Sequence, residues 1–233
     1  MTEPGAARAA EAGRAFDTVL FDIDGTLTDS NGVVMRSLRQ VIAEVGRSGL
    51  AAAVPDDLSF AIGSTSEETI RRVGFKDRAG VLKLWEQRFR EMSDQITIYP
   101  GVPEAVLILR AAGVRLGLVT SKNRDELDHD VRRLDLFQWF ECAVCASDTK
   151  RPKPYPDPLL KAMGDLGVDP RSVLYVGDSP YDQESAAAAG VPFGLAGWGS
   201  VWNGRLPADY VFKTPMDVVA LVLGASRKAK EVG

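Results

Sequence analysis

Residues 18–26 read Thr-Val-Leu-Phe-Asp-Ile-Asp-Gly-Thr, a short apolar run that ends abruptly at Asp22 and Asp24. Three further apolar runs, at 115–119, 172–176 and 192–196, end in Thr or Gly, and a shorter one lies at 210–212. Continuous runs of this kind, rich in β-branched and aromatic residues, are typical of strands buried on both faces. Segments with helical spacing lie between them. The alternation predicts an α/β fold with a doubly wound parallel sheet.

Residues 32–96 have a different pattern. Apolar residues recur with helical spacing at 33–45, 65–73 and 79–92, and no convincing strand is present. We therefore expect a helical block, at 32–96, inserted into an α/β core formed by residues 16–31 and 97–233. Residues 1–15 are rich in Ala, Gly, Glu and Arg and lack the apolar region of a signal peptide, so they are expected to form a flexible tail.

Composition narrows the classes of function. Hydrophobic residues make up 45% and charged residues 26% of the 233 residues, as in ordinary globular proteins. No run approaches the roughly 18 apolar residues of a membrane span, and a net charge of −4 without a basic run argues against nucleic-acid binding. The single histidine, His129, argues against a multi-histidine metal site and is expected on a helix surface. The two cysteines, Cys142 and Cys145, are expected to be inert core residues, and low cysteine content suits the cytoplasm.

Polar side chains follow three of the expected strands: Asp22 with Asp24, Thr120 with Ser121, and Asp178 with Asp182. Ligands of open α/β sheets bind outside the carboxyl ends of the strands, so these side chains are expected to converge. Converging carboxylates repel one another unless a cation lies among them, and oxygen ligands favour Mg²⁺. Lys153 lies in a loop stiffened by four prolines and would add a positive charge near Asp22.

Together these parts describe phosphoryl transfer to a carboxylate. Asp22 would attack phosphorus to form an aspartyl-phosphate, while Mg²⁺ and Lys153 neutralise charge. Asp24 would protonate the leaving alkoxide and then deprotonate the hydrolytic water. Gly25 lets backbone amides approach an anion, and Thr120 offers a hydroxyl beside a helix N-terminus. Taken singly, each residue is more typical of a helix cap, a turn or a solvated side chain; their joint occurrence at strand ends favours the catalytic interpretation.

Four motifs resemble those of the haloacid dehalogenase superfamily of phosphohydrolases: Asp-Ile-Asp-Gly-Thr-Leu-Thr-Asp at 22–29, Leu-Val-Thr-Ser-Lys-Asn at 118–123, Lys-Arg-Pro-Lys-Pro-Tyr-Pro-Asp-Pro at 150–158, and Val-Gly-Asp-Ser-Pro-Tyr-Asp at 176–182. The resemblance implies a Rossmann-like core with the block at 32–96 as an α-helical cap. It also implies that Asp22, Asp24 and Asp178 bind Mg²⁺, Asp24 through its main-chain carbonyl, and that Asp182 supports the metal indirectly. The implied substrate-binding residues are Gly25, Thr26, Thr120, Ser121, Lys122, Lys153 and Gly63 of the cap.

The stretch 60–66, which contains Gly63, suits a flexible loop that dips into the site, and a simple helix–helix connection is an equal alternative. Arg71 and Arg72 are candidates to meet an acidic leaving group, although solvated arginines are more common.

Within this superfamily, a second aspartate such as Asp24 is typical of phosphate-ester hydrolysis, and the lack of a histidine at the cap hinge disfavours a mutase. The stretches Gly-Leu-Val-Thr-Ser-Lys and Lys-Pro-Tyr-Pro-Asp-Pro-Leu-Leu resemble phosphoglycolate phosphatases and related pyrophosphatases. We therefore expect a Mg²⁺-dependent phosphatase of a small phosphorylated metabolite, first of all 2-phosphoglycolate, that acts in the cytoplasm as a monomer or homodimer without nucleic-acid or membrane partners. The alternatives are a pyrophosphatase, a sugar-phosphate phosphatase or mutase, and a non-catalytic phosphate-binding regulatory protein.

Overall fold

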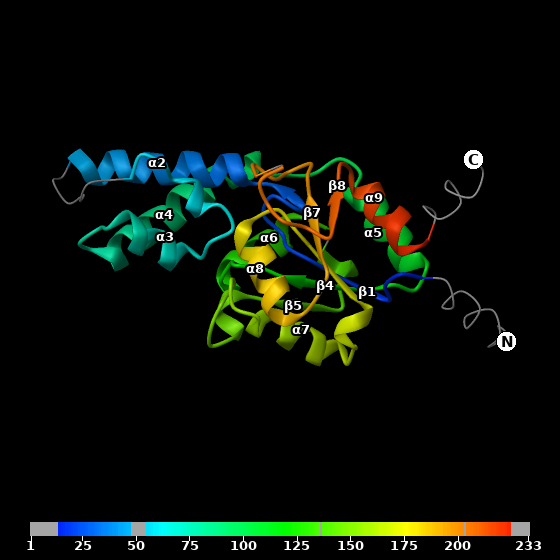
Figure 1. Ribbon diagram of the computed structural model, residues 1–233. Coiled ribbons are helices and arrows are strands. Elements are labelled where there is room, and N and C mark those ends of the chain that lie inside the picture. The colour runs from blue at the N-terminus through cyan, green and yellow to red at the C-terminus, as the bar shows by residue number, and fades with distance from the viewer. Residues whose placement is uncertain (1–13, 48–54, 136, 203, 225–233) are drawn as a thin grey trace.

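A six-stranded parallel sheet forms the centre of the protein in the computed structural model, which describes residues 14–47, 55–135, 137–202 and 204–224 (Figure 1). Nearly all of the tail expected at 1–15 lies outside the described residues. The strands follow the order β5 (Cys142–Val144), β4 (Arg115–Val119), β1 (Thr18–Phe21), β6 (Val173–Gly177), β7 (Phe193–Ala196) and β8 (Tyr210–Phe212). Every neighbouring pair is parallel. The expectation of an α/β fold with a parallel sheet is confirmed.

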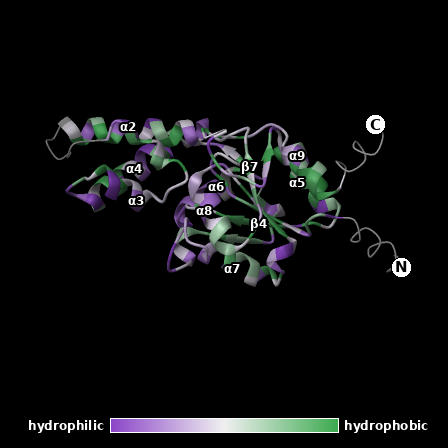
Figure 2. Cartoon of the chain, in the orientation of Figure 1, coloured by the Kyte–Doolittle hydropathy of each residue, from purple (hydrophilic) through white to green (hydrophobic). Residues whose placement is uncertain are grey.

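Helices cover both faces of this sheet. One face packs against α5 (Val102–Ala111), α6 (Arg124–Arg133) and α9 (Pro215–Val222), and the other against α7 (Asp157–Leu166) and α8 (Pro180–Ala189). Side chains alternate along β1, so that Val19 and Phe21 enter the first core and Leu20 enters the second. Figure 2 shows the central strands coloured as hydrophobic between helices of mixed colour. Burial on both faces explains why these strands are continuous apolar runs.

Helix ends are set by local sequence. Asn123 begins α6 in a capping box with Glu126, and Ser179 begins α8 in a capping box with Asp182. In such a box the side chain at the third helical position bonds back to the capping residue. Asp182 is thereby fixed at the start of α8, directly after the end of β6.

A separate helical block lies beside the sheet (Figure 1) and consists of α2 (Asn31–Arg47), α3 (Ser66–Val73) and α4 (Arg78–Met92). It has its own hydrophobic cluster, in which the Trp85 indole donates a hydrogen bond of 2.9 Å to Ser37 Oγ. The chain enters the block after β2 (Thr28–Asp29) and returns through β3 (Thr97–Ile98), and these strands pair antiparallel. Strands of two residues carry no readable pattern, so β2 and β3 were not expected from the sequence.

The structure also places the two cysteines and the single histidine. Both cysteines are free. Cys145 is fully buried, as expected, and burial raises the pKa of its thiol to about 11, which favours the protonated form. Cys142 is only partly buried, so the expectation of a core residue is wrong for it. His129 lies on α6 and is partly buried. Its Nε2 lies 3.0 Å from Ser93 Oγ at the end of the helical block. In the described part of the chain, no helix has the length and apolar character that crossing a membrane requires.

Candidate active site

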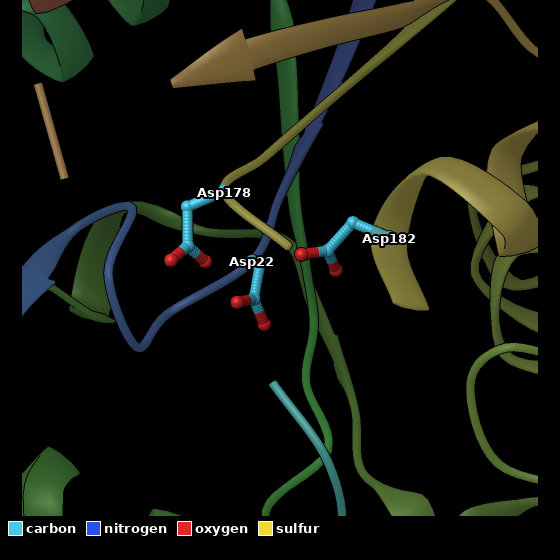
Figure 3. Close-up of side chains that lie close together, drawn as sticks. All are labelled: Asp22, Asp178 and Asp182. Carbon is cyan, nitrogen blue, oxygen red and sulfur yellow. The ribbon is translucent and has the colours of Figure 1, made fainter. Parts of the chain in front are cut away.

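Three buried carboxylates meet at the carboxyl ends of neighbouring strands (Figure 3). Asp22 follows β1, Asp178 follows β6, and Asp182 comes from the first turn of α8. At most 2% of each residue is exposed, and one oxygen of each lies within 4.8 Å of the others. Such proximity of three acids is unfavourable in a buried setting unless positive charge accompanies them.

Lys153 supplies part of that positive charge. Its Nζ lies 2.8 Å from Asp22 Oδ1 and 2.6 Å from Asp182 Oδ1, and it also lies 3.1 Å from the Tyr175 hydroxyl. Burial alone would lower the pKa of Lys153, but the charges of Asp182 and Asp22 outweigh it and raise that pKa. The ammonium group is therefore charged and held directly beside the Asp22 carboxylate.

One lysine does not balance the cluster. Burial raises the pKa of Asp22 to about 7, with Lys153 opposing the rise and Asp182 and Asp24 adding to it. Burial and the charges of Asp182 and Asp22 raise the pKa of Asp178 well above its usual range. Asp178 Oδ2 accepts a hydrogen bond of 3.1 Å from Asn31 Nδ2, whereas Oδ1 is buried without a partner among the described residues. The cluster thus has more acidic groups than cations, and it has an unsatisfied ligand atom.

Asp182 differs from the other two acids because its oxygens are already engaged. Oδ2 accepts hydrogen bonds from the Ser179 amide (3.0 Å) and the Ser179 hydroxyl (2.6 Å). Oδ1 accepts from Lys153 (2.6 Å) and from the Tyr175 hydroxyl (2.7 Å). Asp182 therefore holds Lys153 and the start of α8 in place, and Asp22 and Asp178 are better placed to offer oxygens to a metal.

Asp24 lies on the cavity side of Asp22 and pairs with a second buried lysine. Lys122 Nζ lies 3.0 Å from Asp24 Oδ2 and 3.2 Å from Asp130 Oδ2, and 5.0 Å from the centre of the Phe89 ring. Burial opposes the charge of Lys122, but Asp24 and Asp130 raise its pKa above the usual range. Asp24 Oδ1 is buried with no partner in the described part of the chain, so it remains available to a ligand.

The backbone after Asp24 packs tightly against the acidic cluster. Gly25 has a φ of +77°, and a Cβ at this position would collide with the Asp178 carboxylate and with Asn31. Its N–H donates to Thr28 O at 2.8 Å, and the buried Thr26 Oγ1 has no partner among the described residues. Gly25 thus allows the first and fourth sequence motifs to approach each other.

The turn 197–202 contacts this backbone from the far side. Trp198 Nε1 donates to Thr26 O at 2.8 Å, and Ser200 Oγ donates to Asp178 O at 2.5 Å. Asn31 Nδ2 lies 3.4 Å from Gly199 O. The sequence left the role of the turn at 197–202 open, and these contacts give it a supporting role.

The end of β4 brings the helical block to the core. Thr120 is buried, and its Oγ1 accepts a hydrogen bond of 3.2 Å from the Lys122 amide. Ser121 Oγ donates to Gly63 O at 2.7 Å. Gly63 has a φ of +81°, and a Cβ there would collide with the Ser179 side chain. The loop around Gly63 therefore packs directly on the strand ends that carry the acids.

A small cavity of about 50 Å³ lies between the block and the core. Five of the residues expected from the sequence line it: Asp22, Asp24, Gly63, Ser121 and Lys122. Gly25, Thr26, Thr120, Lys153, Asp178 and Asp182 do not line it. Lining residues that the sequence did not single out are Asn31, Val34, Trp85, Glu86, Phe89 and Glu126. Of these, only Glu126 had a signal, the capping box with Asn123.

The donor set fits a hard divalent cation. Oxygen atoms of Asp22 and Asp178 lie close together, Asp178 Oδ1 is unpartnered among the described residues, and no cysteine or histidine belongs to the described cluster. Carboxylate oxygens with an excess of negative charge favour Mg²⁺ over softer metals.

The comparisons agree with this geometry. Residues 19–196 match the family model described as haloacid dehalogenase-like hydrolase. A Lactobacillus plantarum crystal structure, of a candidate phosphoglycolate phosphatase, superposes with a TM-score of 0.78 at 30% identity and covers 89% of this chain and 99% of that chain. A phosphoglycolate phosphatase of Aquifex aeolicus is 31% identical over 208 residues, which are 88% of this chain and 95% of the relative.

Other relatives have different names. Pyrophosphatase PpaX of Bacillus pumilus is 27% identical over 88% of this chain and 96% of its own length. Tyrosine-protein kinase PtkA of Mycobacterium tuberculosis is 32% identical over 91% of this chain and 71% of its own length. The named activities all involve phosphoryl groups but differ in the acceptor.

Proposed function

The chain belongs to the haloacid dehalogenase-like hydrolases, and from this premise we propose that it is a Mg²⁺-dependent phosphatase of small phosphomonoesters that acts through an aspartyl-phosphate at Asp22. One observation carries the proposal: Lys153 Nζ lies 2.8 Å from Asp22 Oδ1, inside a buried group of acids that opens on a cavity. A nucleophilic carboxylate requires a neighbouring positive charge to admit a negatively charged phosphoryl group.

In the first half of the proposed reaction, an Asp22 oxygen attacks phosphorus and the bond from phosphorus to the leaving oxygen breaks. The leaving oxygen takes a proton from Asp24, which lines the same cavity. Lys122 Nζ lies 3.0 Å from Asp24 Oδ2, so an arriving phosphate would compete with Asp24 for this lysine. We infer that Lys122 turns towards the arriving phosphate and thereby allows Asp24 to carry a proton.

In the second half, a water molecule attacks the phosphorus of the aspartyl-phosphate. Asp24, now ionised, accepts the proton of that water, and the Asp22 carboxylate is regenerated as phosphate leaves. Lys153 remains beside Asp22 throughout, because Asp182 and Tyr175 hold its ammonium group on the other side. The residues proposed to hold Mg²⁺ are Asp22, Asp178 and the main-chain carbonyl of Asp24. When bound, Mg²⁺ supplies charge neutralisation at the phosphoryl oxygens.

The helical block is proposed to act as a cap over this site. Its loop accepts a hydrogen bond from Ser121 at Gly63 O, and Ser66 Oγ donates to Glu126 Oε1 at 2.9 Å. Both contacts join the block to the core at the edge of the cavity. Closure would exclude bulk water during transfer to Asp22, and opening would release the products.

The finer substrate assignment rests on the relatives. The name of the Aquifex aeolicus relative supports 2-phosphoglycolate as the first compound to test, and PpaX supports inorganic pyrophosphate as an alternative. A sugar phosphate is the third. The monomeric or dimeric state and the cytoplasmic location stay predictions.

The test is hydrolysis of p-nitrophenyl phosphate by the Asp22→Asn variant. We expect a loss of at least about a thousandfold in kcat, since the nucleophile is removed, with unchanged circular dichroism. Asp17→Asn is the matched control, because Asp17 precedes the same strand and its side chain is exposed. Retained turnover in Asp22→Asn contradicts the nucleophile. No hydrolysis by the wild-type protein across a broad panel of phosphate esters would support a non-catalytic phosphate-binding protein.

The same assay separates hydrolysis from transfer. Because one relative is named a tyrosine-protein kinase, the assay includes a protein acceptor. A sugar acceptor tests the mutase alternative. Free phosphate equal to the substrate consumed supports the phosphatase, whereas phosphate recovered on an added acceptor supports a transferase or mutase.

A further inference from the structure

The cavity has two chemically different walls. The core wall carries Asp22, Asp24 and Lys122, the groups proposed to handle the phosphoryl group. The wall from the helical block carries one carboxylate, that of Glu86, among neutral side chains: the apolar Val34, Ala61, Trp85 and Phe89 and the polar Asn31, Ser64 and Ser66. A leaving group that extends away from the phosphorus would meet this second wall.

Positive charge is scarce around this cavity. Lys122 is the one cation among its described lining residues, and it is already paired with Asp24 at 3.0 Å and Asp130 at 3.2 Å. Glu86 is partly exposed and has no ion-pair partner within the described ranges, so no protein cation compensates its charge. Glu126, the second glutamate on the lining, accepts hydrogen bonds from Ser66 Oγ and the Asn123 amide. Burial raises the pKa of Glu126, and the charge of Lys122 opposes the rise. Glu86 differs in that it has no such partners among the described residues.

The arginines that might have received a carboxylate lie elsewhere. Arg71 pairs with Glu68 at 2.6 Å on the exposed surface of α3. Arg72 donates a hydrogen bond of 2.9 Å to the Tyr181 hydroxyl, and its guanidinium lies 4.1 Å from the centre of the Phe60 ring. Both line a second cavity, which does not share its lining with the first.

We propose that the leaving group of the substrate is small and uncharged or cationic, and that Glu86 discriminates against leaving groups that carry a carboxylate. This inference rests on the proposed phosphatase function. An anion placed against an uncompensated carboxylate is repelled, whereas an ammonium group gains from both the carboxylate and the aromatic rings. A cavity of about 50 Å³ suits a compact leaving group. The proposal runs against 2-phosphoglycolate, whose leaving group is the glycolate anion.

Three phosphate monoesters of equal length test the proposal: those of glycolate, ethylene glycol and ethanolamine, whose leaving groups are anionic, neutral and cationic. Phosphate release is measured with Mg²⁺ present. We expect kcat/KM for the glycolate ester to be at least about tenfold below that of the ethylene glycol ester, because one like charge faces Glu86. The ethanolamine ester is expected to equal or exceed the ethylene glycol ester.

The variant Glu86→Gln tests whether Glu86 causes the difference in kcat/KM between the esters. It should raise the ratio of kcat/KM between the glycolate and ethylene glycol esters severalfold. Glu91→Gln is the matched control, since Glu91 lies on the same helix outside the cavity and pairs with Arg88. A glycolate ester hydrolysed as fast as the other two, or a ratio that Glu86→Gln leaves unchanged, overturns the inference while the phosphatase function stands. No phosphate release from any of the three esters or from p-nitrophenyl phosphate overturns both.

Discussion

The Asp182 carboxylate lies 2.6 Å from the Lys153 ammonium, and both side chains are fully buried. Lys153 in turn contacts Asp22, so the first turn of α8 fixes the lysine that neutralises the proposed nucleophile. The capping box that starts α8 and the charge pair that serves the site therefore share one residue. Helix geometry and site chemistry are linked at Asp182.

Lys153→Met tests the buried lysine. We expect loss of activity and a decrease of about 3–5 kcal/mol in the free energy of unfolding, because Asp22 and Asp182 would remain buried without a cation. Urea denaturation and phosphate release measure the two effects. Lys150→Met is the control, since Lys150 is exposed in the same loop. Equal stabilities of the two variants would contradict the buried pair.

Asp178 and Asp182 should respond differently to substitution. With Asp178→Asn, we expect the Mg²⁺ concentration for half-maximal activity to rise at least about tenfold, since a ligand of the metal is weakened. With Asp182→Asn, we expect kcat to fall about 10–100-fold through misplacement of Lys153, with a smaller change in Mg²⁺ requirement. An equal loss of Mg²⁺ affinity in both variants would show that Asp182 binds the metal directly.

Mg²⁺ itself should stabilise the folded protein. Binding to the native state alone adds about 2.7 kcal/mol at a hundredfold excess over the dissociation constant, so Tm should rise with MgCl₂. NaCl at the same ionic strength and the Asp178→Asn variant serve as controls and should show little or no rise. Thermal unfolding without substrate measures this effect, which keeps it independent of catalysis. A rise of equal size with NaCl would indicate general screening and no metal site.

Gly63→Ala tests the contact between the helical block and the core. The substitution adds the cost of a positive φ, about 1–2 kcal/mol, and a collision with Ser179. We expect kcat/KM to fall well beyond the loss of stability, because the loop would no longer pack on Ser121. Gly204→Ala is a close control: its φ is +74° and no atom lies within 4 Å of the added Cβ. Equal activity of the two variants would argue against this contact.

Asp130→Asn tests the support of Lys122. Asp130 is 1% exposed and pairs with Lys122 at 3.2 Å. We expect a stability loss of about 1–3 kcal/mol, smaller than for an isolated pair because Asp24 still faces the lysine. KM should rise more than kcat falls, since Lys122 is proposed to meet the substrate. Asp128→Asn, on the exposed side of the same helix, should change neither parameter.

The sequence predicted the central sheet because strands that are buried on both faces consist of continuous apolar runs, such as residues 18–21. It also predicted that acids following β1 and β6 would converge, since parallel strands end at one edge. The sequence also predicted that Lys153 would place a positive charge near Asp22. The paired strands β2 and β3 were not predictable, because two residues carry no periodicity.

The wall of the cavity that the helical block forms was not predictable from the sequence. Glu86 and Phe89 occupy ordinary positions on α4, and only the docking of the block decides which face of that helix meets the core. In the sequence Asp130 resembles a surface acid, but in the structure it is buried beside Lys122. Arg71 and Arg72 were candidates for substrate contact, and the structure pairs them with Glu68 and Tyr181 instead.

The most direct measurement concerns the covalent state of Asp22 during turnover. Protein mixed with substrate and Mg²⁺ is quenched in acid, reduced with borohydride and digested for mass spectrometry. An acyl phosphate at this carboxylate is reduced to an alcohol, so the account expects homoserine at position 22 and none in the Asp22→Asn variant. Phosphate-releasing protein with an unmodified Asp22, or with the reduced product at another acid, would contradict it.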